Sequence, residues 1–175
     1  GLAGTVATPN DTTRDRLRQR AESLGGWPDG LAIAVGQTDA VLRWADAAVV
    51  ASGTVTLQVA RHGTPMVIFY KSDSRFLYSV LSPILFETEF FTLPNLIARR
   101  EIAPEFVPLF GGGAPVVAAA RALVSDPSAA EEQRAQLAEI VGAFEGRSAD
   151  ALAADAIEEI AGIAASAPKA TLAAG

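Results

Sequence analysis

Short apolar runs alternate with segments of helical periodicity through the first half of the chain. The apolar runs predict strands at Gly4–Thr8, Leu31–Val35, Ala47–Ala51, Pro65–Tyr70 and Phe90–Leu93. The helical segments are Thr12–Leu24, Asp39–Ala45, Thr54–His62 and Ser74–Phe86, the last interrupted by Pro83. Continuously apolar strands that are separated by helices are typical of parallel sheets with right-handed crossovers. The pattern therefore predicts an α/β fold, a Rossmann-like parallel sheet with flanking helices.

The second half of the chain has a different texture. Proline and glycine are frequent in Pro94–Pro115, which predicts an irregular but ordered loop. Three extra C-terminal helices are expected at Pro115–Val124, Ser128–Glu145 and Ser148–Ala165. We divide the chain into a sheet domain at 1–125, helices packing on it at 126–166, and a frayed tail at 167–175.

Two helices begin with the Ser/Thr-x-x-Asp/Glu spacing of a capping box. Thr12 stands three residues before Asp15, and Ser128 stands three residues before Glu131. In a capping box the hydroxyl accepts a hydrogen bond from a backbone N–H group of the first turn. The spacing therefore predicts that Thr12 and Ser128 cap their helices.

Composition and charge exclude several classes of function. The 175 residues carry a net charge of −6, and half of them are apolar, so a folded domain is expected and a general nucleic-acid binder is not. The sequence has no cysteine, a single histidine and scattered acidic residues, which predicts no metal site and no cofactor. It shows neither a signal peptide nor a run long enough to span a membrane, so a cytoplasmic location is expected.

The turn after the strand Ala47–Ala51 carries the strongest candidate chemistry. In open parallel sheets ligands bind beyond the carboxyl ends of the strands. Gly53 permits a sharp turn and a close approach of the backbone to a ligand, while Ser52 and Thr54 supply hydroxyl groups beside a helix start. These residues predict an anion site, such as one for a phosphate. The alternative is that Ser52 only caps the following helix.

Three blocks of residues carry a resemblance to a known family. The segments 45–58, 63–70 and 93–106 resemble, in order, the diphosphate loop, the following strand and the Leu-Pro-Asn…Arg-Glu…Pro-Glu signature of the lipid-A-disaccharide synthase family, whose members are glycosyltransferases of the GT-B fold. The resemblance implies that this chain is the C-terminal, donor-nucleotide half of such a fold. It also implies a UDP-linked acylated glucosamine as substrate and an N-terminal acceptor domain, covalent or separate, as partner.

The resemblance assigns roles to individual residues. Ser52, Gly53 and Thr54 would meet the diphosphate, and Gln58 stands where the family usually has a Glu that binds the ribose. The signature implies further UDP contacts by Asn95, Arg99, Arg100 and Glu101, with Arg99 in place of a family Gly. No catalytic residue is assigned, because the family's general base belongs to the acceptor half.

Other interpretations of these signature residues are open. One alternative is a solvent-exposed charge cluster that binds no ligand, formed by Arg99, Arg100 and Glu101. Asn95 follows Pro94, and an Asn in that position is often a turn residue. Because Gln58 and Arg99 depart from the family pattern, the alternative function is a degenerate, non-catalytic binding or assembly module. A different enzyme of the GT-B fold acting on UDP-sugars, such as an epimerase, fits the signature less well.

The ends and surfaces of the molecule leave further questions open. The only methionine is Met66, so we expect the chain to be a fragment or processed product. The resemblance implies that it lacks the first strand of the donor-nucleotide half. Apolar residues at 76–81 suggest contact with an acylated substrate or with the periphery of a membrane. The Ala-rich C-terminal helices leave homo-oligomerisation open as well.

Overall fold

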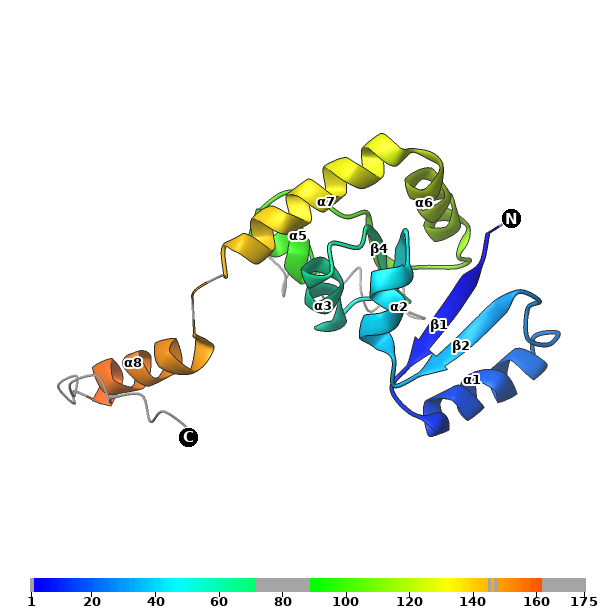
Figure 1. Cartoon of the computed structure of the whole chain (residues 1–175), viewed down its shortest axis with the longest axis horizontal. Helices are drawn as coiled ribbons and strands as arrows, with labels where there is room; N and C mark the ends of the chain where they lie inside the picture. Colours follow the sequence, from blue (N-terminus) through cyan, green and yellow to red (C-terminus); the bar gives the residue numbers. More distant parts are fainter. Residues whose placement is uncertain (1, 72–88, 145, 147, 162–175) are drawn as a thin grey trace, which may run out of the picture. The chain divides into compact units, whose positions relative to one another are not determined.

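The structure, a computed structural model, describes residues 2–71, 89–144, 146 and 148–161 (Figure 1). The chain folds into two compact units, of which the first ends at Val141 and the second starts at Gly142. In the first unit, strands and helices alternate as predicted from the apolar pattern. Its elements are β1 (Gly4–Thr8), α1 (Asp11–Glu22), β2 (Leu31–Val35), α2 (Thr38–Trp44), β3 (Ala48–Ala51), α3 (Val55–Arg61), β4 (Met66–Lys71), α5 (Leu93–Ala98), β5 (Glu105–Leu109), α6 (Ala114–Ser125) and α7 (Pro127–Gly142).

All strand pairs are parallel, but the strands form two sheets. One sheet consists of β1 and β2, with Gly4 opposite Leu31 and Thr8 opposite Val35. The other has the order β3-β4-β5, and its central strand places Met66 opposite Ala48. The predicted α/β class with parallel strands and flanking helices is therefore confirmed, and the sheet itself is divided between β1 and β3.

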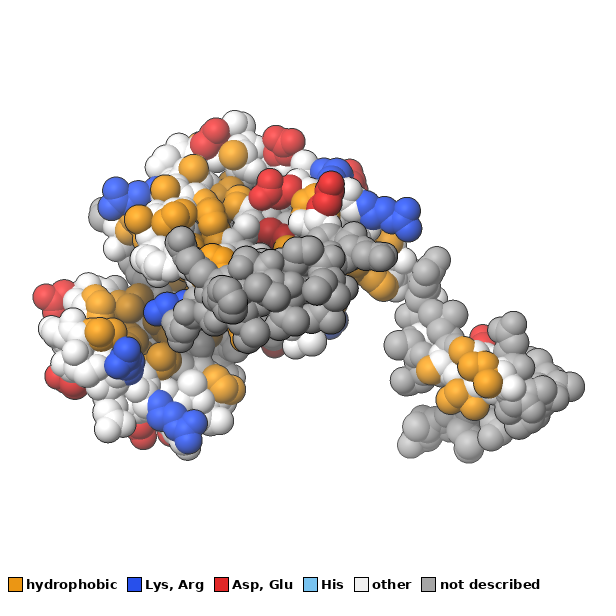
Figure 2. Space-filling model, turned by 180° about the vertical axis from the view of Figure 1, so that it is seen from behind, with side chains coloured by type: hydrophobic (Ala, Val, Ile, Leu, Met, Phe, Trp, Pro, Cys, Tyr) orange, Lys and Arg blue, Asp and Glu red, His pale blue; other side chains and the backbone are white. Residues whose placement is uncertain are grey.

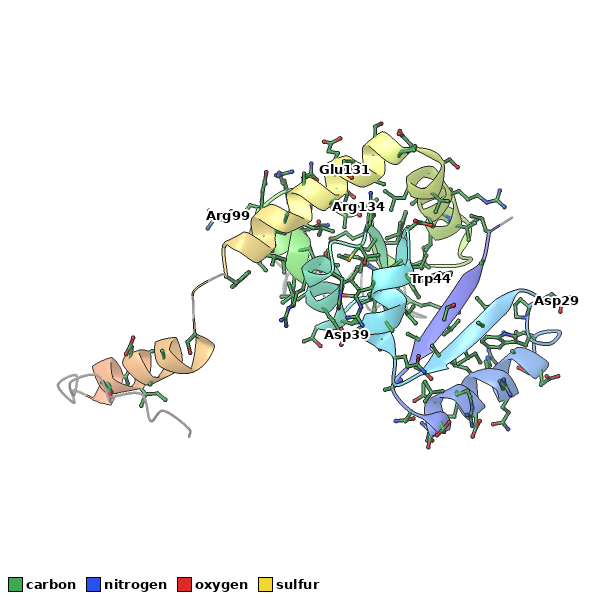
Figure 3. The ribbon with its side chains drawn as sticks, viewed as in Figure 1. Asp29, Asp39, Trp44, Arg99, Glu131 and Arg134 are labelled. Atoms are coloured by element: carbon green, nitrogen blue, oxygen red, sulfur yellow. The ribbon has the colours of Figure 1, made fainter. Side chains whose placement is uncertain are left out.

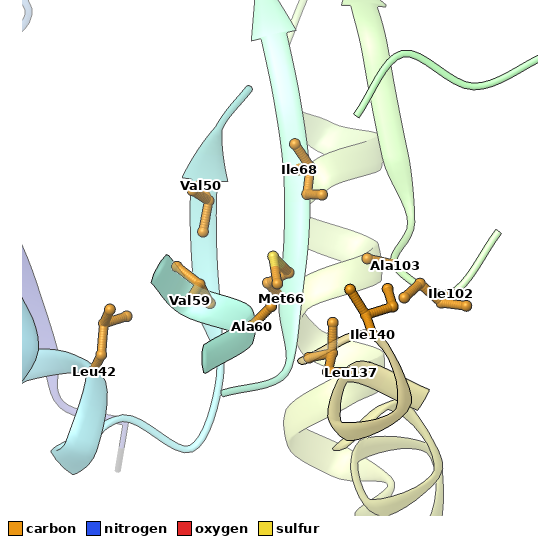
Figure 4. Close-up of a cluster of buried hydrophobic side chains, with 10 residues drawn as sticks. All are labelled: Leu42, Val50, Val59, Ala60, Met66, Ile68, Ile102, Ala103, Leu137 and Ile140. Carbon is orange, nitrogen blue, oxygen red and sulfur yellow. The ribbon is translucent and has the colours of Figure 1, made fainter. Parts of the chain in front are cut away.

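The hydrophobic core lies on the two faces of β4. Met66, Val67 and Ile68 have no solvent exposure, and strand alternation sends the middle one to the opposite face from its neighbours. Met66 packs with Leu137 and Ile140 of α7 (Figure 4), whereas Val67 packs with α6. Full burial of each such side chain contributes about 1.5–3 kcal/mol. The three-stranded sheet is therefore covered by helices on both faces.

A buried glutamine fixes α7 to the sheet. The side chain of Gln133 is 4% exposed, and its Oε1 accepts a hydrogen bond from the backbone N–H of Met66. Its Nε2 donates to the carbonyl oxygen of the same residue at 3.3 Å. This pair of bonds sets the register of α7 against the amino end of β4.

Both predicted capping boxes are wrong. Asn10 caps α1, since its Oδ1 accepts from the backbone N–H of Thr13 at 2.8 Å. At α7 the Oδ1 of Asp126 accepts from the N–H and the hydroxyl of Ser128. In each case the capping residue stands two residues earlier than predicted, so the predicted hydroxyl residue lies within the first turn rather than before it.

The predicted strand Phe90–Leu93 and the predicted loop Pro94–Pro115 are also wrong. Leu93 starts helix α5, and a further strand, β5, runs through the proposed loop. Proline misled the prediction in both places. Pro94 lies in the first helical turn, where a missing N–H costs nothing, and Pro108 lies in an edge strand, where a ladder donor is not needed.

Some predicted elements lie outside the described residues. These are the helix Ser74–Phe86 with its apolar face and the C-terminal tail. The second unit contains α8 (Ala149–Ala161), at whose start the hydroxyl of Ser148 accepts from the N–H of Ala151 at 3.2 Å. Within the described ranges, none of the helices has the length and apolarity needed to cross a membrane.

Candidate nucleotide site

The turn after β3 lies at the carboxyl edge of the three-stranded sheet. Ser52 is held there by its backbone N–H, which donates to the carbonyl oxygen of Phe69 at 2.8 Å. Gly53 has φ 154°, a backbone conformation that side chains disfavour, and its position is open to solvent. The carbonyl oxygen of Gly53 accepts from both the hydroxyl and the N–H of Thr56, at 2.7 and 3.1 Å. The turn is therefore held by hydrogen bonds to β4 and within itself, and its outer side faces solvent.

The hydroxyl groups of this turn are not used as helix caps. The N-cap of α3 is Thr54, and its side chain makes no capping hydrogen bond. The alternative in which Ser52 only caps α3 is therefore wrong. Ser52, Gly53 and Thr54 stand together as predicted, with the first half-buried and the other two exposed.

Gln58 takes part in a cluster that the sequence analysis did not predict. Its Nε2 donates to Oδ1 of Asp39 at 3.0 Å, and Nε2 of His62 lies 2.7 Å from the same oxygen. The amide of Gln58, followed by His62, lowers the pKa of the Asp39 carboxyl below its ordinary value. Gln58 on α3 and His62 at its C-cap are four residues apart, so one helix face presents both to Asp39 on α2. Figure 3 shows Asp39 at the start of α2. The four-residue spacing was the signal available in the sequence.

Asn95 is completely buried, and both ends of its side chain are bonded within the protein. Its Oδ1 accepts from the backbone N–H groups of Ile102 and Ala103 at 2.9 and 3.0 Å. Its Nδ2 donates to the carbonyl oxygen of Ala103 at 2.8 Å and to Oε2 of Glu105 at 2.9 Å. Asn95 therefore ties α5 to the start of β5.

Glu105 completes this network from the strand side. Its Oε1 accepts from the backbone N–H of Phe91 at 2.8 Å, and its Oε2 accepts from the N–H of Thr92 at 3.2 Å and from its hydroxyl. The Asn of the Pro-Asn pair and the Glu of the Pro-Glu pair in the signature are thus joined directly by a hydrogen bond. Sequence reasoning missed this role, although both residues stand in the same block.

The cationic part of the signature lies at the amino edge of the sheet. Arg99 ends α5 in the left-handed conformation, at φ 54° and ψ 28°, and β5 begins only a few residues later. Arg100 donates to Oε2 of Glu139 on α7 at 3.1 Å, and Glu101 is exposed. Figure 3 shows Arg99 beside α5 and α7.

A strand at Phe90–Leu93, as predicted from the apolar pattern, would have placed residues 95–101 at the carboxyl edge, and the structure contradicts that placement, because Leu93 starts α5 instead. Parallel strands of four to six residues, rising about 3.3 Å per residue, separate the two edges by roughly 13–20 Å. The structure brings Ser52, Gly53 and Thr54 together with Gln58 one turn away, and it does not bring Arg99, Arg100 or Glu101 to them.

Comparison with known proteins identifies relatives of the chain. Residues 31–157 match the family described as lipid-A-disaccharide synthetase. The lipid-A-disaccharide synthase of Alcanivorax borkumensis is 30% identical over 153 residues, which cover 87% of this chain and 39% of that protein. The enzyme of the same name from Solibacter usitatus is 34% identical over 140 residues, which cover 79% of this chain and 36% of that protein.

A shorter match is closer in sequence. The lipid-A-disaccharide synthase of Rickettsia felis is 43% identical over 63 residues, covering 36% of this chain and 16% of that protein. The chain spans less than two fifths of the length of these curated relatives. Because the family match extends over more than half of the chain and includes the Ser52–Thr54 turn, the chain belongs to the lipid-A-disaccharide synthetase family.

Proposed function

We propose that this chain is the donor-nucleotide-binding part of a lipid-A-disaccharide-synthase-type glycosyltransferase of lipid A biosynthesis. The donor is a UDP-linked acylated glucosamine. The observation that carries the proposal is the family match over residues 31–157, inside which an exposed Ser-Gly-Thr turn stands at the carboxyl edge of a parallel sheet. The acceptor site and the catalytic base belong, in this proposal, to a further domain or chain.

The turn supplies the groups that a diphosphate needs. The hydroxyls of Ser52 and Thr54 donate to phosphate oxygens, and Gly53 lets the backbone N–H groups come close. The outer side of the turn is accessible to phosphates, because Gly53 and Thr54 are exposed and the space beside the Gly53 Cα is open. Substituting Gly53 would still strain the turn, since its φ of 154° disfavours a side chain.

Gln58 recognises the ribose through its carbonyl oxygen. Its Nε2 is already bonded to Asp39 at 3.0 Å, so Oε1 is the group that accepts from a ribose hydroxyl. The bond to Asp39 also fixes the orientation of the amide. A neutral acceptor binds a hydroxyl less strongly than a carboxylate does, so we expect weaker ribose binding than a Glu at this position would give.

The signature residues contribute mainly through the fold. Asn95 uses its side-chain oxygen and nitrogen within the protein, and Arg100 pairs with Glu139 at the other edge of the sheet. Direct contact of Asn95, Arg99, Arg100 or Glu101 with UDP stays a prediction. The proposed site itself is built on Ser52–Thr54 and Gln58.

Isothermal titration of UDP into the folded chain tests the proposal. We expect saturable one-to-one binding, weakened at least tenfold in the double variant Ser52→Ala, Thr54→Val. Thr12→Val is the matched control, since Thr12 is an exposed threonine on α1, away from the turn, and we expect it to bind UDP like the natural chain. Absence of binding by a folded chain, or equal loss in the control, would contradict the proposal.

The second candidate function is a non-catalytic module that has lost the donor site. The observation that favours it is the bond between Gln58 and Asp39, because a Glu at position 58 would face another carboxylate there. The discriminating protein is the triple variant Gln58→Glu, Asp39→Asn, Arg99→Gly. If UDP affinity appears only in the variant, the natural chain has lost the site. If the natural chain binds UDP and the variant binds it equally or less tightly, the donor-binding proposal stands.

A further inference from the structure

The carboxylate of Asp39 is held at one oxygen and open at the other. Its Oδ1 accepts from Nε2 of Gln58 at 3.0 Å, and Nε2 of His62 lies 2.7 Å from the same atom. Within the described part of the chain, the second oxygen, Oδ2, has no hydrogen-bond partner. The Asp39 side chain is 60% exposed, so a ligand can reach Oδ2.

This carboxylate stays ionised at neutral pH. The hydrogen bond from Gln58, followed by that from His62, lowers the pKa of Asp39, and the charge of Arg43 on the same helix acts in the same direction. An ionised carboxylate can only accept hydrogen bonds, and it accepts them more strongly than a neutral group does. Oδ2 of Asp39 is therefore suited to a ligand hydroxyl group.

Asp39 lies close to the Ser-Gly-Thr turn through its bond to α3. It stands in the first turn of α2, beyond the carboxyl end of β2, as the turn stands beyond the carboxyl end of β3. Gln58 follows Thr54 by one helical turn, which corresponds to about 6 Å between Cβ atoms. The hydrogen bond from Gln58 then brings the carboxylate of α2 to the same side of α3.

Two acceptors remain available in this pair of side chains. Nε2 of Gln58 and Oδ1 of Asp39 bind each other, which leaves Oε1 of the amide and Oδ2 of the carboxylate. A ribose presents two adjacent hydroxyl groups, and each of them can donate one hydrogen bond. In a nucleoside diphosphate this sugar is joined directly to the first phosphate, so phosphates at the turn leave the sugar within reach of the pair.

We propose that Asp39 binds the ribose of the donor nucleotide together with Gln58. Oδ2 of Asp39 accepts from one ribose hydroxyl, and Oε1 of Gln58 accepts from the other. Helix α2 thus supplies the carboxylate that position 58 lacks, and His62 acts as a positioning residue that holds Oδ1. The inference rests on the proposed function, and it adds a preference for ribonucleotides over deoxyribonucleotides.

The alternative is that the three side chains only join α2 to α3. The variant Asp39→Asn distinguishes the two roles. An Asn keeps a side-chain oxygen that accepts from Gln58, but it replaces Oδ2 with an NH₂ group, which cannot accept from a hydroxyl. A purely structural role therefore predicts that the variant treats nucleotides with and without ribose hydroxyls in the same way as the natural chain.

Isothermal titration with UDP and with 2′,3′-dideoxy-UDP measures this preference. We expect the natural chain to bind UDP about tenfold more tightly than the dideoxy analogue, because a hydrogen bond to a charged group is lost with the hydroxyls. In Asp39→Asn, the UDP affinity should fall by about fivefold or more, whereas the affinity for the analogue should change by less than about twofold.

The matched control is Asp29→Asn, which removes the same charge elsewhere. Asp29 is exposed and stands just before β2, at the end of that strand away from Asp39 (Figure 3). Acidic and basic side chains are interspersed on the face that Figure 2 shows, so we expect the loss of one distant charge to leave UDP binding unchanged.

The outcomes separate this inference from the donor-binding proposal. UDP binding that is equal in the natural chain and Asp39→Asn would overturn the role of Asp39 and leave the donor site at the turn intact. Equal weakening of UDP and the analogue in Asp39→Asn, or equal weakening of UDP binding in Asp29→Asn, would overturn it as well. Absence of UDP binding by the folded natural chain would overturn both proposals.

Discussion

Removal of the Asn95 side chain tests whether the family signature holds the fold. In Asn95→Ala, the backbone N–H groups of Ile102 and Ala103 lose their acceptor, and the carbonyl oxygen of Ala103 loses a donor. Asn95 and Ala103 have no solvent exposure, and Ile102 is 5% exposed, so water does not readily replace these bonds. The variant therefore leaves several buried polar groups without partners.

The expected cost follows from these groups. An unsatisfied buried donor or acceptor costs about 1–3 kcal/mol, and partial relaxation of the site recovers some of this. We therefore expect Asn95→Ala to lower the free energy of unfolding by about 3–5 kcal/mol. This is a large share of the roughly 5–15 kcal/mol that stabilises a typical domain.

Urea unfolding followed by circular dichroism measures this cost. The control is Asn10→Ala, which removes the same side chain from an exposed helix cap and should cost about 0.5–2 kcal/mol. Hydrogen exchange of the natural chain gives an independent result, with the amides of Ile102 and Ala103 among the slowest. If Asn95→Ala costs no more than Asn10→Ala, or if these amides exchange rapidly, the structural role of the signature is refuted.

Three further predictions concern single residues. Arg99→Gly should raise the free energy of unfolding by about 1 kcal/mol in urea titrations, because Arg99 stands at φ 54° where glycine is unstrained; a loss of stability would contradict this. Gln58→Ala should raise the pKa of Asp39 toward its ordinary value of 3.8, as followed by carbon-detected NMR titration. Because folding lowers this pKa, the stabilisation from Asp39 is present at neutral pH and is lost as the pH falls through the folded pKa in the acid range; an unchanged titration would argue against the cluster. Gln133→Ala should lower the melting temperature and speed amide exchange at Met66, whose backbone it holds; unchanged exchange would show that α7 is held otherwise.

Much of the strand pattern could be predicted because apolar runs are local. Gly4–Thr8 and Leu31–Val35 agree with β1 and β2 to the residue. The errors arise where a single residue type has two structural uses. Pro94 lies in the first turn of a helix and Pro108 lies in an edge strand, whereas the composition of the segment predicts loop residues at both positions.

In the candidate site too, features that are local in the sequence could be predicted, and contacts between distant residues could not. Ser52, Gly53 and Thr54 are contiguous, so one turn brings them together whatever the rest of the chain does. The bond from Gln58 to Asp39 joins residues 19 apart, and the bond from Asn95 to Glu105 joins residues 10 apart. Such contacts depend on how α2, α3, α5 and β5 pack, which periodicity does not encode.

NMR mapping of UDP on the folded, isotope-labelled chain tests the central claim most directly. The donor-binding proposal predicts that the largest amide shifts occur at Gly53 and Thr54, with the side-chain amide of Gln58 also moving. The amides of Arg99–Glu101, at the opposite edge of the sheet, should shift as well only if the family signature contacts UDP directly. Shifts confined to that opposite edge, or no shifts at saturating UDP, would contradict the account.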